Sequence, residues 1–283
     1  MSLSMKAGAE HSVPELAALF NRAFTGYIGG NITFDTNGFH SLLARENVDL
    51  TLSRVLTHDD QAVGISLIAR QGWTSRVAGM GIVPEAQGQG MGTWFLEQLV
   101  SEAKARGERA MVLEAYEQNT PAVRLYLRTG FTIVQRLYGY TAQGLSGLTA
   151  TELAGLDKLS EVDIYEVGKL IVEHGESNLP WQVSGTSIAR LGLPYRAFRL
   201  NAAYAVLTDS GEKIVLRALI VDPPLRRQGH GTRLLEALAA RYADKEWNIP
   251  PLCPEVHGEN FFEKRGFVRT KLNQVQMECL LDK

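Results

Sequence analysis

Apolar residues recur at helical spacing in some stretches of the chain and form short runs in others. Leu16, Leu19, Phe20 and Ala23 fall at i, i+3, i+4 and i+7, which is the spacing of one face of a helix. We therefore predict the following elements in the first half: helices at residues 13–28, 39–45, 93–106 and 121–128, and strands at residues 49–56, 62–69, 76–83, 110–115 and 132–138.

The second half carries a similar pattern. We predict helices at residues 162–172, 231–242 and 261–264, and strands at residues 197–208, 213–221 and 268–280. Strands that alternate with amphipathic helices in this way are typical of an α/β fold with a mixed sheet.

An internal repeat relates the two halves. Gly92-Thr93-Trp94-Phe95-Leu96-Glu97 aligns with Gly231-Thr232-Arg233-Leu234-Leu235-Glu236, and Gly130-Phe131 aligns with Gly266-Phe267. The offset of about 140 residues is the size of a domain, so we predict two tandem domains. We place them at residues 1–141 and 142–283, because residues 140–149 are rich in Gly, Ser and Thr and read as a linker.

Composition narrows the class of protein. A length of 283 residues favours about two domains, and a net charge of −2 gives no reason to expect a nucleic-acid partner. Two cysteines, Cys253 and Cys279, are too few for a disulfide framework and suit a reducing cytoplasm. We expect no membrane span, because no apolar run is long enough, and no secretory signal at the N-terminus. We predict no metal site.

A glycine-rich stretch joins the strand at residues 76–83 to the helix at residues 93–106. It reads Gln87-Gly88-Gln89-Gly90-Met91-Gly92. A strand, a glycine turn and a helix N-terminus together can hold a phosphate, because the first helical N–H groups lack partners inside the helix. No Lys follows the glycines, which excludes a Walker loop, and their spacing differs from the Rossmann G-x-G-x-x-G.

The spacing that does fit is [Q/R]-x-x-G-x-[G/A]. Gln87, Gly90 and Gly92 match it in the first half, and Arg226, Gly229 and Gly231 match it in the second. This spacing resembles the acyl-CoA-binding loop of the GNAT (GCN5-related) N-acetyltransferase family. The segment from Asn119 to Phe131 is similar to the family's N-x-x-A-x-x-L-Y-x-x-x-G-F segment.

The resemblance implies a fold, a cofactor and a set of site residues. Each half would be a GNAT fold with a splayed sheet, and the cofactor would be acetyl-CoA. In the first half the resemblance implies cofactor contacts from the following residues: Met80, Ile82, Val83, Gln87, Gly88, Gln89, Gly90, Met91, Gly92, Thr93, Asn119 and Tyr126. Thr93 could instead be an ordinary first-turn residue, and Asn119 could instead be a helix N-cap.

Tyr126 is the most specific prediction for a single catalytic residue. The matching tyrosine of the family lies near the CoA sulfur and donates a proton to the departing thiolate; the alternative is an amphipathic core tyrosine. The attacking amine also has to lose a proton. Glu114, in a buried strand, and Glu85, at the end of the preceding strand, are candidate bases, with Tyr116 as a further option. Either carboxylate could equally be structural or solvated.

The acceptor pocket of the fold lies between the first helices and the splayed strands. The aromatic residues of that region are Phe24, Tyr27, Phe34 and Phe39, and they belong either to the pocket or to the core. The acceptor would be a primary amine of a small molecule or peptide, with neither nucleic acid nor membrane as a partner.

The second half departs from the family pattern. Counting back from Gly266-Phe267 places Phe262 at the tyrosine position and Glu255 at the asparagine position, while Pro250, Pro251 and Pro254 interrupt the matching strand. Its loop could still bind cofactor through the following residues: Val221, Arg226, Arg227, Gln228, Gly229, His230, Gly231 and Thr232. We interpret this half as a partly degenerate domain.

Together these features predict direct transfer of acetyl from acetyl-CoA to an amine in the first half. Neither cysteine lies there, which argues against a cysteine-linked intermediate. Two alternatives stay open. Catalysis could reside in the second half, or the protein could bind acyl-CoA as a regulator without turnover.

Overall fold

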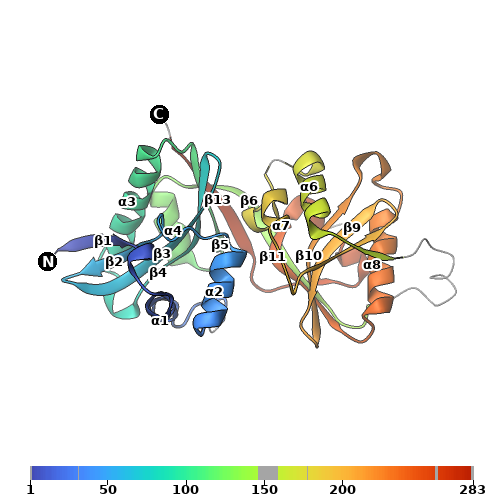
Figure 1. The fold of residues 1–283 in the computed structure, drawn as a ribbon, viewed down its shortest axis with the longest axis horizontal. Helices are drawn as coiled ribbons and strands as arrows, with labels where there is room; N and C mark the ends of the chain where they lie inside the picture. The colour runs from blue at the N-terminus through green and yellow to red at the C-terminus, as the bar shows by residue number, and fades with distance from the viewer. Residues whose placement is uncertain (1, 31, 146–158, 177, 259–260, 282–283) are drawn as a thin grey trace. The chain divides into compact units, whose positions relative to one another are not determined.

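The computed structural model describes residues 2–30, 32–145, 159–176, 178–258 and 261–281. The chain forms two compact units (Figure 1). The first consists of Met1–Gln135 together with Gln274–Lys283, and the second consists of Arg136–Asn273. Part of the linker predicted at residues 140–149 lies outside the described residues. Its first residues belong to a strand that ends at Ala142.

The first unit is an α/β unit around one sheet. Its helices are α1 (Val13–Ala23), α2 (Thr36–Arg45), α3 (Met91–Ala105) and α4 (Thr120–Arg128). Its strands are β1 (Leu3–Ala7), β2 (Arg54–His58), β3 (Gln61–Gln71), β4 (Thr74–Ile82), β5 (Ala110–Tyr116) and β13 (Gln274–Leu280). The strand order is β1-β2-β3-β4-β5-β13, and the β4–β5 pair is parallel while the others are antiparallel.

Helix α1 starts as its sequence predicts but ends earlier. Ser12 is the N-cap and forms a reciprocal capping box with Glu15, and Pro14 occupies the first turn. The helix ends at Ala23 and not at residue 28, because the chain then turns through Gly26 with φ +70°. This turn directs Tyr27 away from the helical path and toward β5, where its ring lies 5.8 Å from that of Tyr116.

Opposite faces of the first sheet carry different helices. A Cβ added to Gly81 would meet Ala23 of α1 and its C-cap Phe24, whereas Ile82, the next residue, lies near Gly92 of α3. Consecutive strand residues point to opposite faces. Helix α1 therefore covers one face of β4 and α3 begins on the other, so that the end of β4 lies between them.

The last strand of the chain belongs to the first unit. Residues 274–280 of β13 pair antiparallel with residues 110–116 of β5, and Val275 and Met277 of β13 are fully buried in the first core. The predicted strand at residues 268–280 is thus two strands. Val268–Arg269 (β12) pairs within the second unit, and Gln274–Leu280 completes the first. This division differs from a simple boundary after residue 141.

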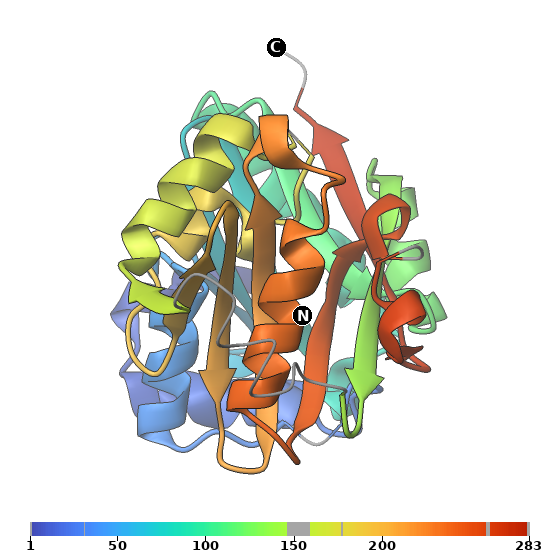
Figure 2. The same ribbon diagram turned by 90° about the vertical axis from the view of Figure 1, so that its right-hand side faces the viewer.

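The second unit repeats the arrangement. Its helices are α6 (Ile164–His174), α7 (Gly185–Ile188), α8 (His230–Arg241) and α9 (Glu255–Gly258). Its further strands are β7 (Ser160–Val162), β8 (Arg196–Leu200), β9 (Ala203–Asp209), β10 (Lys213–Val221) and β11 (Glu246–Pro254). Helix α8 packs on β8, β9 and β10 (Figure 2). The predicted strand at residues 197–208 is instead the β8–β9 hairpin, which turns at Asn201 with φ +53°.

β6 (Thr132–Ala142) starts in the first unit and continues into the second, where it pairs antiparallel with β11. In the first unit β13 lies beside β5, and in the second unit β6 lies beside β11. In each unit this neighbouring strand comes from a distant part of the chain. None of the helices in the described residues is both long and apolar enough to cross a membrane.

Candidate active site

The parallel strands β4 and β5 separate before they end. They pair only over Thr74–Val77 and Ala110–Leu113. A β-bulge in β4 lies at this point, because Leu67 and Ile68 of β3 are opposite Gly79 and Val77 and leave Ala78 unpaired. Beyond the bulge β4 continues to Ile82 with no β5 partner among the described residues. On the β5 side, the backbone groups of Met80 and the N–H of Ile82 can pair with an extended ligand, whereas the Ile82 carbonyl accepts from Gln87.

The glycine loop follows the free end of β4. The side-chain amide of Gln87 donates to the Ile82 carbonyl at 2.8 Å, which closes the loop against the strand. Gly88 and Gly90 take left-handed φ values of +76° and +80°, and α3 begins directly after Gly90 without a side-chain cap. Within the part of the chain that the structure describes, the N–H groups of residues 88–92 have no acceptor. The loop is thus an uncapped helix N-terminus that favours an anion.

Two predicted cofactor residues can act only through their backbone. The Met91 side chain is buried in the first core, and Val83 is fully buried with its N–H donated to the Val63 carbonyl at 2.9 Å. Gln89 is exposed and its amide lies 3.3 Å from the Glu85 carbonyl. The Thr93 N–H bonds the Gly90 carbonyl at 3.1 Å, as expected for the first turn of a helix.

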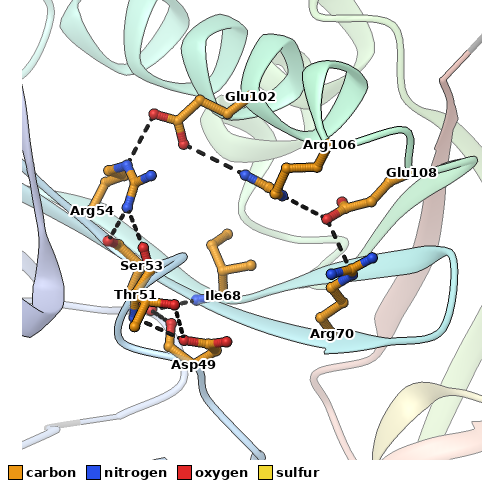
Figure 3. A network of polar contacts seen from close by, with 9 residues as sticks. All are labelled: Asp49, Thr51, Ser53, Arg54, Ile68, Arg70, Glu102, Arg106 and Glu108. Atoms are coloured by element: carbon orange, nitrogen blue, oxygen red, sulfur yellow. Dashed lines mark hydrogen bonds and ion pairs between the residues drawn. The ribbon is translucent and has the colours of Figure 1, made fainter.

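The far end of α3 is held by a polar network (Figure 3). Arg54 of β2 donates to Glu102 of α3 at 2.9 Å, and Arg106 donates to Glu108 at 2.7 Å. The Glu108 carboxylate is fully buried and also lies 3.5 Å from Arg70 of β3. These contacts tie the C-terminal end of α3, which lies opposite the glycine loop, to β2 and β3.

Helix α4 brings Tyr126 into the first unit. Asn119 is its N-cap and accepts the Ala122 N–H at 3.4 Å, so the alternative given for Asn119 is the contact that the structure shows. Tyr126 is buried beside Phe131, with ring centroids 5.9 Å apart. Burial raises the pKa of Tyr126 to about 12, so its hydroxyl keeps its proton at neutral pH.

Two other tyrosines of the first unit contact each other. Tyr27 packs against Tyr116 at the end of β5. The pKa of Tyr27 is raised by burial and then by the neighbouring charges that Tyr116 and Tyr126 would carry. Burial also raises the pKa of Tyr116. All three tyrosines therefore keep their protons at neutral pH. Sequence analysis placed Tyr27 only among the aromatic residues of the acceptor region.

The other aromatic residues of the acceptor region pack around Phe20. Phe20 stacks on Phe24 with centroids 4.2 Å apart and also contacts Phe34 and Phe39. Phe39 is fully buried, so it is a core residue, whereas Phe24 and Tyr27 are half-buried and can border a pocket.

The two candidate carboxylate bases have different surroundings. Glu114 is buried, with its side chain 1% exposed, and accepts Nε of Arg76 at 2.7 Å. Glu85 is exposed and paired with Arg22 at 2.7 Å. Its pKa is lowered by its own backbone N–H and then by Arg22, so it is ionised at neutral pH. Arg76 was not predicted as a site residue, although an arginine inside an apolar strand is the signal that could have found it.

The second unit reproduces the loop geometry. Nε of Arg226 donates to the Val221 carbonyl at 3.1 Å, as Gln87 does to Ile82. Gly229 has φ +87°, and Arg227 adopts φ +65° at the position of Gly88. β10 pairs with β11 only over residues 213–215 and 246–248, after which the strands separate. Pro250 and Pro251 fall in the register gap between Ile249 and Cys253, where a missing N–H costs no ladder bond.

A cavity of about 1100 Å³ opens between these strands and the second loop. Its lining carries five Arg and Lys side chains against two Glu, which favours an anionic ligand: Arg217, Arg226, Arg227, Lys264, Arg265, Glu176 and Glu236. Gln228 is exposed, His230 and Gly231 begin α8, and Thr232 contacts Arg265. Phe262 packs between Tyr140 and Phe267 and has no hydroxyl to donate. Glu255 accepts the Tyr138 hydroxyl at 3.0 Å.

A sheet whose central parallel strands separate beside an uncapped glycine loop defines an acetyltransferase fold of the GNAT type. Residues 14–131 match the acetyltransferase (GNAT) family and residues 198–269 match an acetyltransferase (GNAT) domain. The chain therefore belongs to the GNAT family, with two such domains in tandem.

Similar proteins agree with this assignment. N-alpha-acetyltransferase 30 of Schizosaccharomyces pombe is 35% identical over 98 residues, which is 32% of this chain and 65% of that protein. A GCN5-related N-acetyltransferase of Sphaerobacter thermophilus covers 99% of this chain and 96% of its own at 13% identity, with a TM-score of 0.67. A tandem GNAT protein of the clavulanic acid biosynthesis pathway covers 100% and 99% at 13% identity, with a TM-score of 0.61. This chain spans less than two thirds of the length of N-alpha-acetyltransferase 30.

Proposed function

We propose that the first unit binds acetyl-CoA and transfers its acetyl group to a primary amine of a small molecule or peptide. The observation that carries this proposal is the row of N–H groups without acceptors at residues 88–92. This row follows the part of β4 that has no β5 partner. The row suits a pyrophosphate, and the free strand edge suits an extended pantetheine arm.

The reaction would proceed by direct transfer. The amine nitrogen forms a bond to the carbonyl carbon, the carbon–sulfur bond breaks, and Tyr126 gives its proton to the thiolate. A backbone N–H near Met80–Ile82 would stabilise the oxyanion. Tyr126 is suited to this role because it is buried and still protonated at neutral pH.

For the proton that the amine loses, the geometry favours Tyr116 over both carboxylates. Glu114 faces Arg76, and Glu85 points into solvent beside Arg22. Tyr116 ends β5 on the side where β4 has departed, in contact with Tyr27. A tyrosine there can take the proton when its own is passed on through a neighbouring hydroxyl or water.

For the second unit we propose binding of acyl-CoA without transfer. The basic cavity and the loop geometry that this unit shares with the first support binding, whereas Phe262 cannot protonate a thiolate. We also propose a cytoplasmic location, because the two cysteines of the sequence are too few for a disulfide framework.

Calorimetry with acetyl-CoA tests both proposals on the intact chain. We compare the wild type with Gly90→Glu and the matched variant Gly229→Glu, each of which puts a carboxylate where a pyrophosphate would lie. We expect two sites in the wild type and loss of a different one in each variant. Absence of binding would contradict an acyltransferase. Binding with no acetylation of any primary amine in a broad panel would favour the regulatory alternative, and acetylation that survives Gly90→Glu but not Gly229→Glu would place catalysis in the second unit.

A further inference from the structure

A chain of four charged side chains crosses the face of the first sheet that α1 covers. Arg76 of β4 donates through Nε to Glu114 of β5 at 2.7 Å and through Nη1 to Glu46 at 2.9 Å. Arg45, at the end of α2, donates to the other oxygen of Glu46 at 3.0 Å. Arg76 and Glu114 are 4% and 1% exposed, so the ion pair between them is shielded from water.

The position of this chain in the fold is specific. Arg76 is opposite Val112 in the β4–β5 ladder, and the ladder ends one pair later, at Val77 and Leu113. Glu114 is the next β5 residue and the first without a β4 partner. The ion pair therefore spans the two strands at the point where they separate. Through Glu46 the same arginine is also tied to the C-terminal end of α2.

The partners of Arg76 favour its charged form. Burial by itself would lower the pKa of Arg76, but the charges of Glu114 and Glu46 outweigh burial and raise that pKa above its ordinary value. Two arginines and two glutamates sum to zero. A buried carboxylate that accepts from a guanidinium on another strand is a structural link between the two elements.

We propose that the charged chain Arg45–Glu46–Arg76–Glu114 sets the separation of β4 and β5, and with it the width of the cofactor cleft. Glu114 is then a positioning residue that holds Arg76, and not the base that deprotonates the amine. The inference rests on the proposed binding of acetyl-CoA in the first unit. It adds that the affinity for this ligand depends on a buried ion pair that touches none of it.

The test compares two buried carboxylates of the same unit. Glu114→Gln removes the charge at the strand separation, and Glu108→Gln removes an equally buried charge beyond the far end of α3 (Figure 3). Acetyl-CoA affinity is measured by calorimetry and Tm by thermal unfolding, both in full-length protein carrying Gly229→Glu to silence the second loop. We expect both substitutions to lower Tm. Only Glu114→Gln should weaken acetyl-CoA binding, by about tenfold or more, because small displacements of binding groups carry large costs.

A third variant separates positioning from folding. This variant combines Glu46→Leu, Arg76→Met and Glu114→Leu. It replaces the buried charges by apolar side chains of similar size, which often restores stability. We expect its Tm to recover toward the wild type while its acetyl-CoA affinity stays low. Equal affinity losses in Glu114→Gln and Glu108→Gln, or wild-type affinity in Glu114→Gln or in the apolar variant, would overturn the inference. A wild type that binds no acetyl-CoA would instead refute the proposed function, and this inference with it.

Discussion

At the scale of single residues, burial decides what each predicted group can do. Tyr126 and Glu114 are both buried, yet Tyr126 is held among aromatic side chains and Glu114 beside a guanidinium. The first environment keeps a proton in place, and the second holds the carboxylate in an ion pair. The residue types and their strand or helix were predictable from motif and pattern. Their partners were not, because Arg76 meets Glu46 and Glu114 across 30 and 38 positions of the chain.

Tyr126→Phe should separate the role of this residue in chemistry from its role in stability. We expect amine acetylation to fall by roughly 10²–10⁴ in kcat with acetyl-CoA affinity kept, because only the proton donor is lost. The same substitution should flatten the alkaline loss of stability. The native pKa of about 12 exceeds the ordinary value of 10.0, so between pH 10 and 12 the unfolded state binds fewer protons than the native state, and stability falls as pH rises.

Urea unfolding at several pH values measures this effect. Tyr126 contributes roughly 1 kcal/mol per pH unit to the slope of stability against pH within that window. Below the window this slope is zero and the stabilisation is fully present. Other tyrosines also titrate there, so the quantity to compare is the difference in slope between the wild type and Tyr126→Phe. Parallel slopes would mean that the Tyr126 hydroxyl is solvated in the native protein.

At the scale of elements, the glycine loops show which features of a motif are structural requirements. Gly90 and Gly229 both take a left-handed φ directly before a helix, and both loops keep this residue as glycine. At the preceding glycine position the two units differ, since Arg227 adopts the φ that Gly88 has. The strand, loop and helix were predictable from local pattern. Helix α1 was predicted five residues too long because Tyr27 and Ile28 continue its apolar character past the turn.

Substitutions at the two glycines should therefore have unequal effects. Gly90→Val places a β-branched side chain at φ +80°, which costs about 1–2 kcal/mol even though nothing lies within reach of its Cβ. Gly88→Asn should cost only a few tenths of a kcal/mol, because Asn tolerates this region and the second unit already carries a side chain there. Chemical denaturation of both variants measures the difference. Equal costs would show that the loop conformation differs from the one described.

At the scale of the whole molecule, the feature that pattern could not reveal is the assignment of the last strand. Residues 274–280 alternate as a strand should, but nothing local in them states that β5 is their partner. The internal repeat groups residues 274–280 with the second half of the chain. We therefore predicted the domain boundary after residue 141. The structure assigns β13 to the first unit, where Val275, Met277, Cys279 and Leu281 are all buried. The first unit is thus complete only when residues 274–281 are present.

Fragments of the chain test this dependence. Residues 1–141 alone should fail to fold cooperatively, because four buried apolar side chains at about 1.5–3 kcal/mol each approach the whole stability of a domain. Joining Gln135 to Gln274 through a short Asn-Gly turn should restore folding and acetyl-CoA binding. The ends are close enough, since the Gln135 side chain donates to Gln276 at 2.6 Å and the Thr132 hydroxyl lies 3.4 Å from the Glu278 carbonyl. Circular dichroism melts and calorimetry are the measurements.

Met277→Asp in the joined protein is the control and should abolish folding again, because Met277 is fully buried. Cooperative unfolding of residues 1–141 with intact binding would show that β13 is dispensable to the first unit.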